Sequence, residues 1–317
     1  MFSAFNPFWA TPFSQHMSQN FDKNSAWYRT VWPYLLTAVA PLCWGGNIVL
    51  ARGVADIIPP VSFAFWRWAT AFVILLPFTW RTARQDWSRV VKSWKIISVL
   101  SILGISLFNT LLYTAVHTTT AINGAMIQTT MPAVIILATL VMFKEKVTRL
   151  QMLGVAICII GAFIVILRGR WNTLLGMSFA PGDIMIMGAV ILYALYSALL
   201  RQRPAIHPLS FLTYTFGLGI IFLLPLYVWE LAGRATMTLT YPVLLSILYV
   251  AVFPSIVAYF CWNRGVEIFG ANRAGLFINL IPVFASILAI LFLGETLQAF
   301  HIVGMALIFS GMILFNH

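Results

Sequence analysis

The chain has 317 residues, of which 61% are apolar and only 9% charged, and its mean hydropathy is +0.92. Soluble domains carry about 25% charged residues and about 45–50% apolar ones, so this composition excludes a soluble globular protein. The apolar stretches run without interruption for about 20 residues, the length that crosses a bilayer as a helix. They lack the polar–apolar alternation of barrel strands. The sequence therefore predicts an all-α membrane protein.

Ten transmembrane helices are expected, joined mostly by short connections that leave no room for a soluble domain. The predicted spans are 31–52, 61–79, 95–116, 121–143, 149–167, 183–201, 209–229, 242–264, 271–293 and 297–315. They divide into a first five-helix repeat over 31–167 and a second over 181–316, preceded by a cytoplasmic tail over 1–30.

The second half of the chain repeats the first. A shift of 150 residues superposes Pro132 on Pro282, Glu145 on Glu295, Gly154 on Gly304 and Gly161 on Gly311. Further upstream, a shift of 148 superposes Pro60 on Pro208 and Phe63 on Phe211. Because five crossings leave the chain on the opposite side, the second repeat is expected to be inverted relative to the first. Inverted repeats are how many secondary transporters build alternating access around one midplane site.

The formal net charge of +11 would suggest nucleic acid in a soluble protein, but its distribution indicates a membrane instead. With a cytoplasmic N-terminus, fourteen of the 19 Lys and Arg residues lie in cytoplasmic segments and four outside. Such an excess is the positive-inside signal. It predicts a plasma (inner) membrane protein with both termini in the cytoplasm and no nucleic-acid partner.

The tail over 1–30 is rich in aromatic and small polar residues and lacks the features of a signal peptide. It is interpreted as a mobile tail, or alternatively as an aromatic segment lying on lipid headgroups. The three cysteines all fall within spans and are expected to be free thiols. No Cys/His spacing resembles a metal site, and neither a metal nor a cofactor is expected.

Unusual residues for a lipid-facing helix gather in the first span, which reads Pro41-Leu-Cys-Trp-Gly-Gly-Asn47. Glycine allows close backbone approach, proline frees a carbonyl, and a buried amide needs a partner. Asn47 fits an interhelical hydrogen bond or a cavity wall equally well, whereas Trp44 favours a cavity wall.

Several motifs resemble one known family. They are Trp44-Gly-x-Asn47, the arginine of Phe65-Trp-Arg67-Trp68, the pairs Met131-Pro132 and Ile281-Pro282, and the segments Phe143-Lys-Glu145 and Leu293-Gly-Glu295 with the glycine-containing helices that follow. In these features the chain resembles the EamA-type drug/metabolite transporters over about residues 31–316. Lys144 departs from the family's usual glycine, which Gly294 keeps. The resemblance implies ten transmembrane helices in two inverted five-helix repeats, and transport, often export, of small metabolites.

Two proline-interrupted helices point to a binding site. Gln128 and Thr129 precede Pro132, and Asn279 precedes Pro282 at the matching position of the other repeat. Interrupted helices mark the binding site of inverted-repeat transporters. We therefore expect Pro132 and Pro282 to be hinges and the three polar residues to meet substrate at the midplane.

Other spans add polar and aromatic candidates for the substrate site: Asn109, Tyr113, Tyr193, Tyr196, Tyr214, Tyr259, Trp262 and Asn263. The deeper tyrosines lie too far from the span ends for a headgroup belt. Arg67 is the one basic residue that lies more than two positions from the end of a predicted span. It is expected to anchor at the outer headgroups, or alternatively to contact substrate or act as a gate.

Glutamates and glycines at matching repeat positions favour structural roles. Glu145 precedes Thr148-Arg-Leu-Gln151, a capping-box pattern, and Glu295 is expected to stabilise the start of the last span. Gly154 and Gly161, like their repeat partners, lie on one helix face and favour close packing.

No nucleophile–base pair, metalloprotease motif or phosphate-binding loop is present, so an enzyme is not expected. We expect a secondary transporter that moves a small organic, amino-acid-like metabolite by alternating access; the residues leave import or export open, and export is what the family resemblance often implies. The alternatives are the same fold carrying a drug or a nucleotide sugar, or a non-transporting scaffold or receptor. The sequence does not distinguish a monomer from a homodimer. All eight acidic residues lie at or beyond a span end, which favours facilitated or exchange transport over proton coupling.

Overall fold

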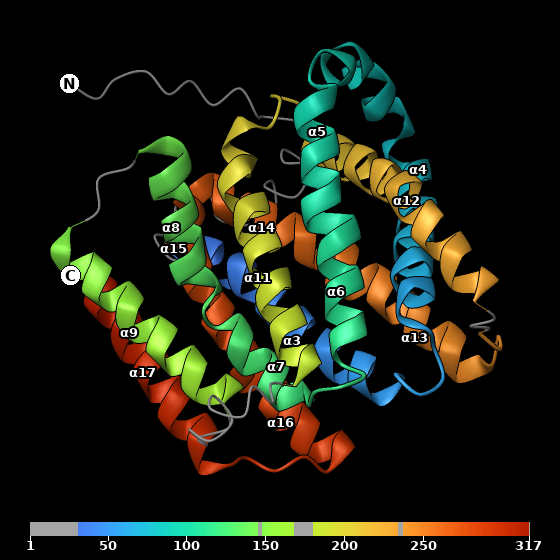
Figure 1. Cartoon of the computed structure of the whole chain (residues 1–317). Helices are drawn as coiled ribbons and strands as arrows, with labels where there is room; N and C mark the ends of the chain where they lie inside the picture. Colours follow the sequence, from blue (N-terminus) through green and yellow to red (C-terminus); the bar gives the residue numbers. More distant parts are fainter. Residues whose placement is uncertain (1–30, 145–147, 168–179, 234–236, 317) are drawn as a thin grey trace, which may run out of the picture.

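A computed structural model describes residues 31–144, 148–167, 180–233 and 237–316, which form a bundle of helices (Figure 1). The first repeat begins with α3 (Trp32–Gly53) and α4 (Pro60–Lys92). Its third span consists of α5 (Trp94–Ser101), a π-helical turn η1 (Ile102–Leu107) and α6 (Phe108–Ala115). Its fourth span consists of α7 (Ala121–Gln128) and α8 (Met131–Phe143), and α9 (Arg149–Ile166) is the fifth.

The second repeat has the same order. It begins with α11 (Pro181–Leu199), followed by the short 3-10 turn η2 (Leu200–Gln202), and with α12 (Pro208–Ala232). Its third span consists of α13 (Tyr241–Ala251), the π-helical turn η3 (Val252–Val257) and α14 (Ala258–Phe269). Its fourth span consists of α15 (Ala271–Gly275), the 3-10 turn η4 (Leu276–Leu280) and α16 (Ile281–Leu293), and α17 (Ala299–Asn316) is the fifth.

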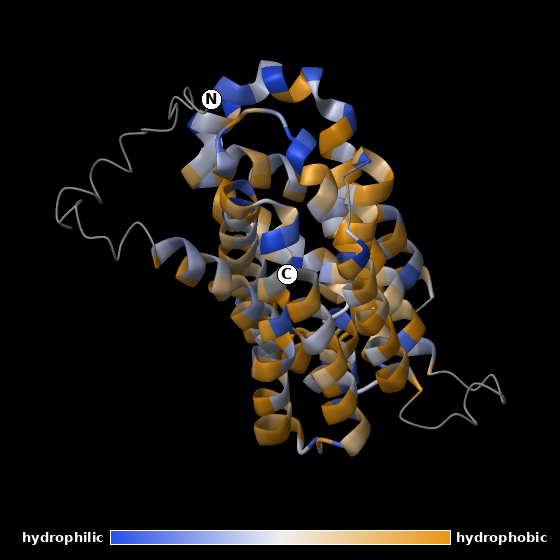
Figure 2. Ribbon diagram, turned by 90° about the vertical axis from the view of Figure 1, so that its left-hand side faces the viewer, coloured by the Kyte–Doolittle hydropathy of each residue, from blue (hydrophilic) through white to orange (hydrophobic). Residues whose placement is uncertain are grey.

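Within the described residues, eight helical spans are long and apolar enough to cross a bilayer, and α9 and α17 are shorter apolar helices. Hydrophobic residues dominate along the bundle, and hydrophilic ones are most concentrated at one of its ends, at the top of Figure 2. The expected all-α fold of two five-helix repeats is confirmed.

The second span differs from its prediction because α4 continues to Lys92 instead of ending at residue 79. Pro77 lies inside the helix without ending it. Beside it, the Thr79 hydroxyl donates to the Leu75 carbonyl at 3.0 Å. Beyond residue 80, Ala83, Asp86 and Val90 are buried at helical spacing, so the extension is an amphipathic helix packed on one face. The sequence analysis missed this extension because an amphipathic segment does not form a continuous apolar run.

Two helix pairs form the edges of the bundle. At one edge α9 lies against α17, and at the other α4 lies against α12, while α3, α11 and the third and fourth spans fill the middle (Figure 1). The α9–α17 contact confirms the glycine prediction. A Cβ atom added at Gly161 would lie 2.7 Å from the Gly304 carbonyl oxygen, and one at Gly311 would lie 2.5 Å from the Gly154 carbonyl oxygen.

The caps partly follow the sequence. Thr148 and Gln151 form the expected capping box at the start of α9. The expectation that Glu295 stabilises the start of the last span is wrong. The Glu295 carboxylate accepts from the backbone N–H groups of Ala121 and Ile122, at 2.8 and 2.9 Å, at the start of α7. The last span instead begins with a bond from the Gln298 N–H to His301 Nδ1. Glu145 and the tail over 1–30 lie outside the described residues.

Candidate substrate-binding site

Arg67 lies in the middle of the bundle, with 1% of its surface exposed. Its Nε atom donates to the Ser255 hydroxyl at 2.6 Å, and Nη2 donates to the Pro254 carbonyl at 2.8 Å. Nη1 lies 2.8 Å from Asn109 Oδ1 and 2.6 Å from the Tyr113 hydroxyl. A longer contact of 3.3 Å joins Nη1 to Asn47 Oδ1. We call these partners with Arg67 the Arg67 group: Arg67, Asn47, Asn109, Tyr113, Pro254 and Ser255.

All the partners of Arg67 among the described residues are neutral. A guanidinium stays protonated in proteins, so its charge persists in the interior. None of the six described carboxylates contacts Arg67. Asp56 is exposed, and Glu267 pairs with Arg203 and Arg264. The other four accept hydrogen bonds from other residues: Asp86 from the His207 N–H, Asp183 from Thr119 and Asn123, Glu230 from Val61 and Ser62, and Glu295 from Ala121 and Ile122. The Trp68 ring, 4.7 Å from the guanidinium carbon, offers partial compensation through a cation–π contact.

The π-helical turn η3 brings the Pro254 carbonyl and Ser255 to Arg67. Proline has no N–H and its ring clashes with the carbonyl four residues earlier, here that of Val250. The Ser255 hydroxyl donates to that carbonyl at 2.7 Å, which keeps it paired while the turn widens. The Pro254 carbonyl then accepts from Arg67 and, at 3.2 Å, from Trp44 Nε1. Such π-bulges recur at functional sites.

The other third span contains the repeat-related turn. Gly104, 150 residues before Pro254, lies in η1, and its carbonyl accepts from the Tyr259 hydroxyl. Asn109 Nδ2 donates to the Ile105 carbonyl at 3.0 Å. Both π-helical turns thus expose carbonyls toward the same central region.

Paired hydrogen bonds relate the two repeats. Tyr113 donates to Asn47 Oδ1 at 2.8 Å in the first repeat, and Tyr196 donates to Asn263 Oδ1 at 2.9 Å in the second. A shift of 150 residues places Tyr113 on Asn263, so the third span supplies the tyrosine of the pair in the first repeat and the amide in the second. The bonds from Arg67 to Ser255 and from Tyr259 to the Gly104 carbonyl join the two repeats, so the site lies across the boundary between them.

Large aromatic side chains surround this boundary. We call them the aromatic group: Trp44, Trp68, Tyr193, Tyr196, Tyr259 and Trp262. The Trp44 ring lies 5.5 Å from Tyr193 and 5.4 Å from Trp262, and Trp68 lies 5.2 Å from Tyr259 in an edge contact. Of the six, only Trp44 is more than slightly exposed. The other five rings are buried.

Four buried polar groups of this region have no hydrogen-bond partner among the described residues: Trp68 Nε1, Trp262 Nε1, Asn263 Nδ2 and the Tyr193 hydroxyl, of which the first three can only donate. Buried donors are normally paired, because an unpaired one costs about 1–3 kcal/mol. Together with Arg67 they make the region rich in hydrogen-bond donors.

Most of the predicted site residues come together here: Trp44, Asn47, Asn109, Tyr113, Tyr193, Tyr259, Trp262 and Asn263, with Arg67. The guanidinium does not reach the end of the bundle, where an anchor would lie. Sequence reasoning missed Trp68 and Ser255 as members. The internal repeat offered a signal for the location of the site, because Gly104 and Pro254 disturb the helix at matching positions of the two repeats.

The polar residues of the fourth spans lie apart from Arg67, and no described contact joins them to it. Gln128 Nε2 and Thr129 Oγ1 bond carbonyls of their own helix, and Asn279 Oδ1 is buried without a described partner. The helices do break where the prolines indicate, before α8 and α16. A hinge role for Pro132 and Pro282 stays a prediction.

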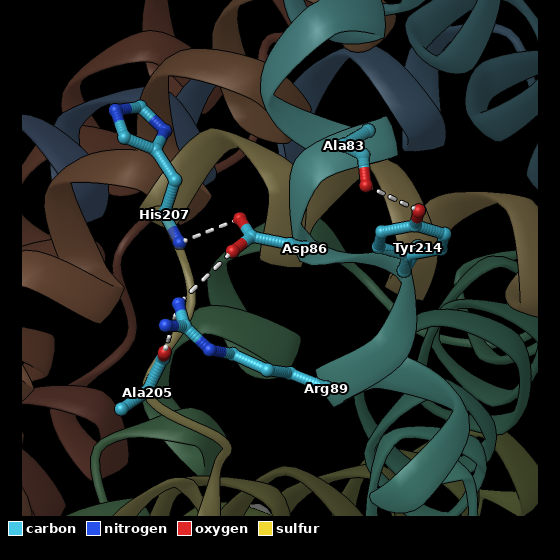
Figure 3. Close-up of polar contacts among 6 residues, drawn as sticks. All are labelled: Ala83, Asp86, Arg89, Ala205, His207 and Tyr214. Carbon is cyan, nitrogen blue, oxygen red and sulfur yellow. Dashed lines mark hydrogen bonds and ion pairs between the residues drawn. The ribbon is translucent and has the colours of Figure 1, made fainter.

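Tyr214 lies at one end of the bundle instead of in its centre. Its hydroxyl donates to the Ala83 carbonyl at 2.7 Å, beside Asp86 (Figure 3). Asp86 accepts from the His207 N–H at 3.0 Å and lies 3.5 Å from Arg89. We call this the Asp86 end. Here the last turns of α4 are tied to the start of α12. Burial lowers the pKa of His207, opposed by the Asp86 carboxylate.

At the opposite end, the Glu230 end, acidic residues of the second repeat hold helix starts of the first. Glu230 accepts from the N–H groups of Val61 and Ser62, at 2.9 and 2.6 Å. Glu295 caps α7 in the same way. Asp183 accepts from Thr119 and Asn123 side chains, both at 2.5 Å. Carboxylates at helix N-termini are stabilised by the helix dipole, so this end is held shut by contacts between repeats.

Comparison with known protein families identifies the family of this chain. The model of the EamA-like transporter family matches residues 31–167 and again residues 180–317. The chain belongs to the EamA-like transporter family. As an EamA-like protein it is a multi-pass membrane transporter of small molecules and not an enzyme.

Relatives of the EamA-like chain include other transporters. It is 28% identical to the transporter YyaM of Bacillus subtilis over 281 residues, covering 88% of this chain and 92% of that one. It is 25% identical over 186 residues to a protein of Streptantibioticus cattleyicolor named a probable terminal-alkyne amino-acid exporter, covering 58% of this chain and 60% of that one. A solved crystal structure shares the fold with a TM-score of 0.64 and 15% identity, over 89% of this chain and 95% of that one.

Proposed function

We propose that this transporter moves a small, amino-acid-like organic metabolite across the plasma membrane by alternating access, in the direction of export. The observation that carries the proposal is the buried site between the repeats, where one cation, several amides and hydroxyls, and six aromatic rings meet. Ligand sites are mostly apolar with a few convergent polar groups, and this composition suits a small molecule with one polar head.

Alternating access is supported by the contacts that close each end. At the Glu230 end, acids of the second repeat hold helix starts of the first, and at the Asp86 end Asp86 of the first repeat holds the start of α12 in the second. Both sets join one repeat to the other. Opening one end of the bundle requires only the contacts at that end to separate. The central site lies between the two ends and can therefore be reached from either side in turn. The interrupted fourth spans, with Pro132 and Pro282 as hinges, supply the flexible points.

The orientation follows from charge. With the Asp86 end in the cytoplasm, the arginines and lysines of the α4 extension and of the η2 turn face the side that positive residues prefer. Both termini are then cytoplasmic. The direction of export rests on the named amino-acid exporter among the relatives, and it is the part of the proposal that a flux assay addresses first.

Facilitated or exchange transport is proposed as the energy source. The described acidic residues are all at helix ends, in connections or in the α4 extension, and the central site holds none of them. A proton-coupled carrier keeps a titratable group at membrane depth. A nucleotide sugar suits the site poorly, since its pyrophosphate needs several cations and Arg67 is the one described basic residue in the Arg67 and aromatic groups.

The test is a comparison of metabolites in the medium of cells with and without the protein. It is followed by efflux of each candidate, radiolabelled, from proteoliposomes. We expect at least one amino-acid-like compound to accumulate outside producing cells. Its efflux should fall strongly in Trp44→Ala, whose ring contacts several members of the site, while folding and expression stay near those of the parent. Equal flux through protein-containing and empty liposomes for every candidate would refute transport.

A further inference from the structure

We propose that Arg67 recognises a carboxylate of the transported molecule and that the aromatic group holds its apolar body, so that an amino group on the substrate is dispensable. This inference rests on the proposed function, because it assigns a chemical class to the same central site. It narrows amino-acid-like compounds to small organic acids with an apolar body, with or without an amino group.

The first argument is the missing counter-charge. Taking an ion out of water is costly unless a partner of opposite charge compensates it. Arg67 is 1% exposed, and the acceptors around it are amides, hydroxyls and one carbonyl. These orient the guanidinium without neutralising it. Nη2 carries two N–H groups and only one, toward Pro254, is paired with a described residue. A ligand carboxylate would supply both the charge and the missing acceptor.

The second argument is the surplus of donors. Trp68 Nε1, Trp262 Nε1 and Asn263 Nδ2 are buried without a described partner. Each of these atoms can donate but cannot accept. A carboxylate has about four acceptor positions on its two oxygens and no donor. A ligand rich in acceptors therefore satisfies this region better than one rich in donors.

The third argument concerns the amino group. An ammonium is recognised by carboxylates, by carbonyls or by aromatic faces. All six described carboxylates are either exposed or bonded away from the central site. The exposed carbonyls are also engaged, since Pro254 accepts from Arg67 and Gly104 accepts from Tyr259. For an ammonium there remain ring faces and one neutral acceptor, the Tyr193 hydroxyl, so its contribution to binding is small.

The fourth argument is the asymmetry of the repeats. The shift of 148 residues that relates α4 to α12 places Thr215 opposite Arg67 and Phe216 opposite Trp68. The Thr215 hydroxyl only bonds carbonyls of its own helix, and the Trp68 and Phe216 rings lie 4.7 Å apart. Charge thus comes from the first repeat alone, while four of the six aromatic residues come from the second. The substrate accordingly binds with its carboxylate toward α4 and its apolar body toward α11 and α14.

The experiment measures binding of three matched compounds to the purified full-length protein in nanodiscs: 3-phenylpropanoate, its neutral amide 3-phenylpropanamide, and phenylalanine. The first two differ by one charged group, and the first and third by one amino group. Binding is followed by calorimetric titration and by the shift in melting temperature.

We expect 3-phenylpropanoate to bind at least about tenfold more tightly than its amide. Tenfold corresponds to about 1.4 kcal/mol, which is near the lower limit for hydrogen bonds to a charged group. Phenylalanine should bind within about threefold of 3-phenylpropanoate, because the amino group adds little beyond cation–π contacts.

Two variants link the selectivity to Arg67. Asn47→Asp keeps both acceptor contacts, to Arg67 and to Tyr113, and gives the guanidinium a carboxylate of the protein's own. Its carboxylate-to-amide preference should fall to about one, without loss of packing. Arg67→Gln should lose the preference as well. Gln85→Glu adds the same charge on an exposed position of α4 and should keep the parent's preference.

Equal binding of 3-phenylpropanoate and its amide to the parent would overturn the inference, as would a preference that survives in Asn47→Asp. Binding by phenylalanine alone would show that the amino group is required and would also overturn it. So would the failure of a panel of aliphatic and aromatic carboxylates to bind. In each case transport of another compound, detected by the medium comparison, would leave the proposed function standing.

Discussion

Replacing Gly104 with alanine tests the close packing of the two repeats at the centre of the site. An added Cβ would lie 2.5, 2.7 and 2.8 Å from three ring atoms of Tyr196, well inside van der Waals contact. The ring cannot easily turn away. Its hydroxyl donates to Asn263 at 2.9 Å, and its centroid lies 5.1 Å from that of Tyr193. Overpacking of this kind costs about 1–3 kcal/mol, and we expect Gly104→Ala to lose that much free energy of unfolding.

The matched control is Gly188→Ala. Its added Cβ would meet one atom, Leu111 Cδ1, at the ordinary distance of 3.4 Å. Both substitutions restrict the unfolded backbone equally, by up to about 1 kcal/mol in favour of the fold, so the difference between them isolates the clash. The assay is equilibrium unfolding in nanodiscs, followed by tryptophan fluorescence.

A double variant makes the assignment specific. Removing the ring in Tyr196→Leu should make the further change at Gly104 nearly harmless, with a coupling free energy of about 1 kcal/mol or more. If Gly104→Ala were as stable as Gly188→Ala, or if its cost were the same with and without the Tyr196 ring, the packing described at η1 would be refuted.

Three further predictions concern the ends of the bundle. Glu295→Gln should destabilise the protein by about 1–3 kcal/mol, because an amide cannot accept both N–H groups at the start of α7 with the strength of a carboxylate; an unchanged melting temperature would contradict this. Burial holds the pKa of His207 below its ordinary 6.5, so the folded protein binds the proton less readily than the unfolded chain. Stability from this group is full above about pH 6.5 and is lost as the pH falls toward the folded pKa, and the parent should lose more stability than His207→Asn between about pH 7.5 and 5.5; parallel curves would count against it. Reporter fusions after Phe315 and Arg84 should report a cytoplasmic location and one after Arg170 an external location, and a C-terminal reporter active outside would reverse the orientation.

The fold was predictable from two simple features, apolar length and internal repetition. Both depend on the bilayer, which demands a helix of about 20 apolar residues for each crossing. The extension of α4 to Lys92 was not found, because a helix that leaves the membrane becomes amphipathic and no longer reads as an apolar run. Glu295 was placed near a helix start, but which helix it caps depends on tertiary structure.

The site was predictable in its residue types more than in its arrangement. Deep amides and aromatic residues such as Asn47, Trp44 and Tyr259 are costly to bury without a purpose, and they do converge. Tyr214 and Gln128 have the same chemistry yet lie outside the described cluster, because hydropathy reports depth but not the direction in which a side chain points. The π-helical turns escaped detection, since a widened turn arises from competition among backbone hydrogen bonds.

The central claim, that one site alternates between the two sides of the membrane, is tested most directly by counterflow. Proteoliposomes are loaded with excess unlabelled substrate from the medium comparison and diluted into a trace of the labelled compound. A carrier with one alternating site must accumulate label transiently above its equilibrium level, and Trp44→Ala should abolish the overshoot. Label that only approaches equilibrium, at a rate independent of the internal substrate, would show a pore or a leak and would contradict the account.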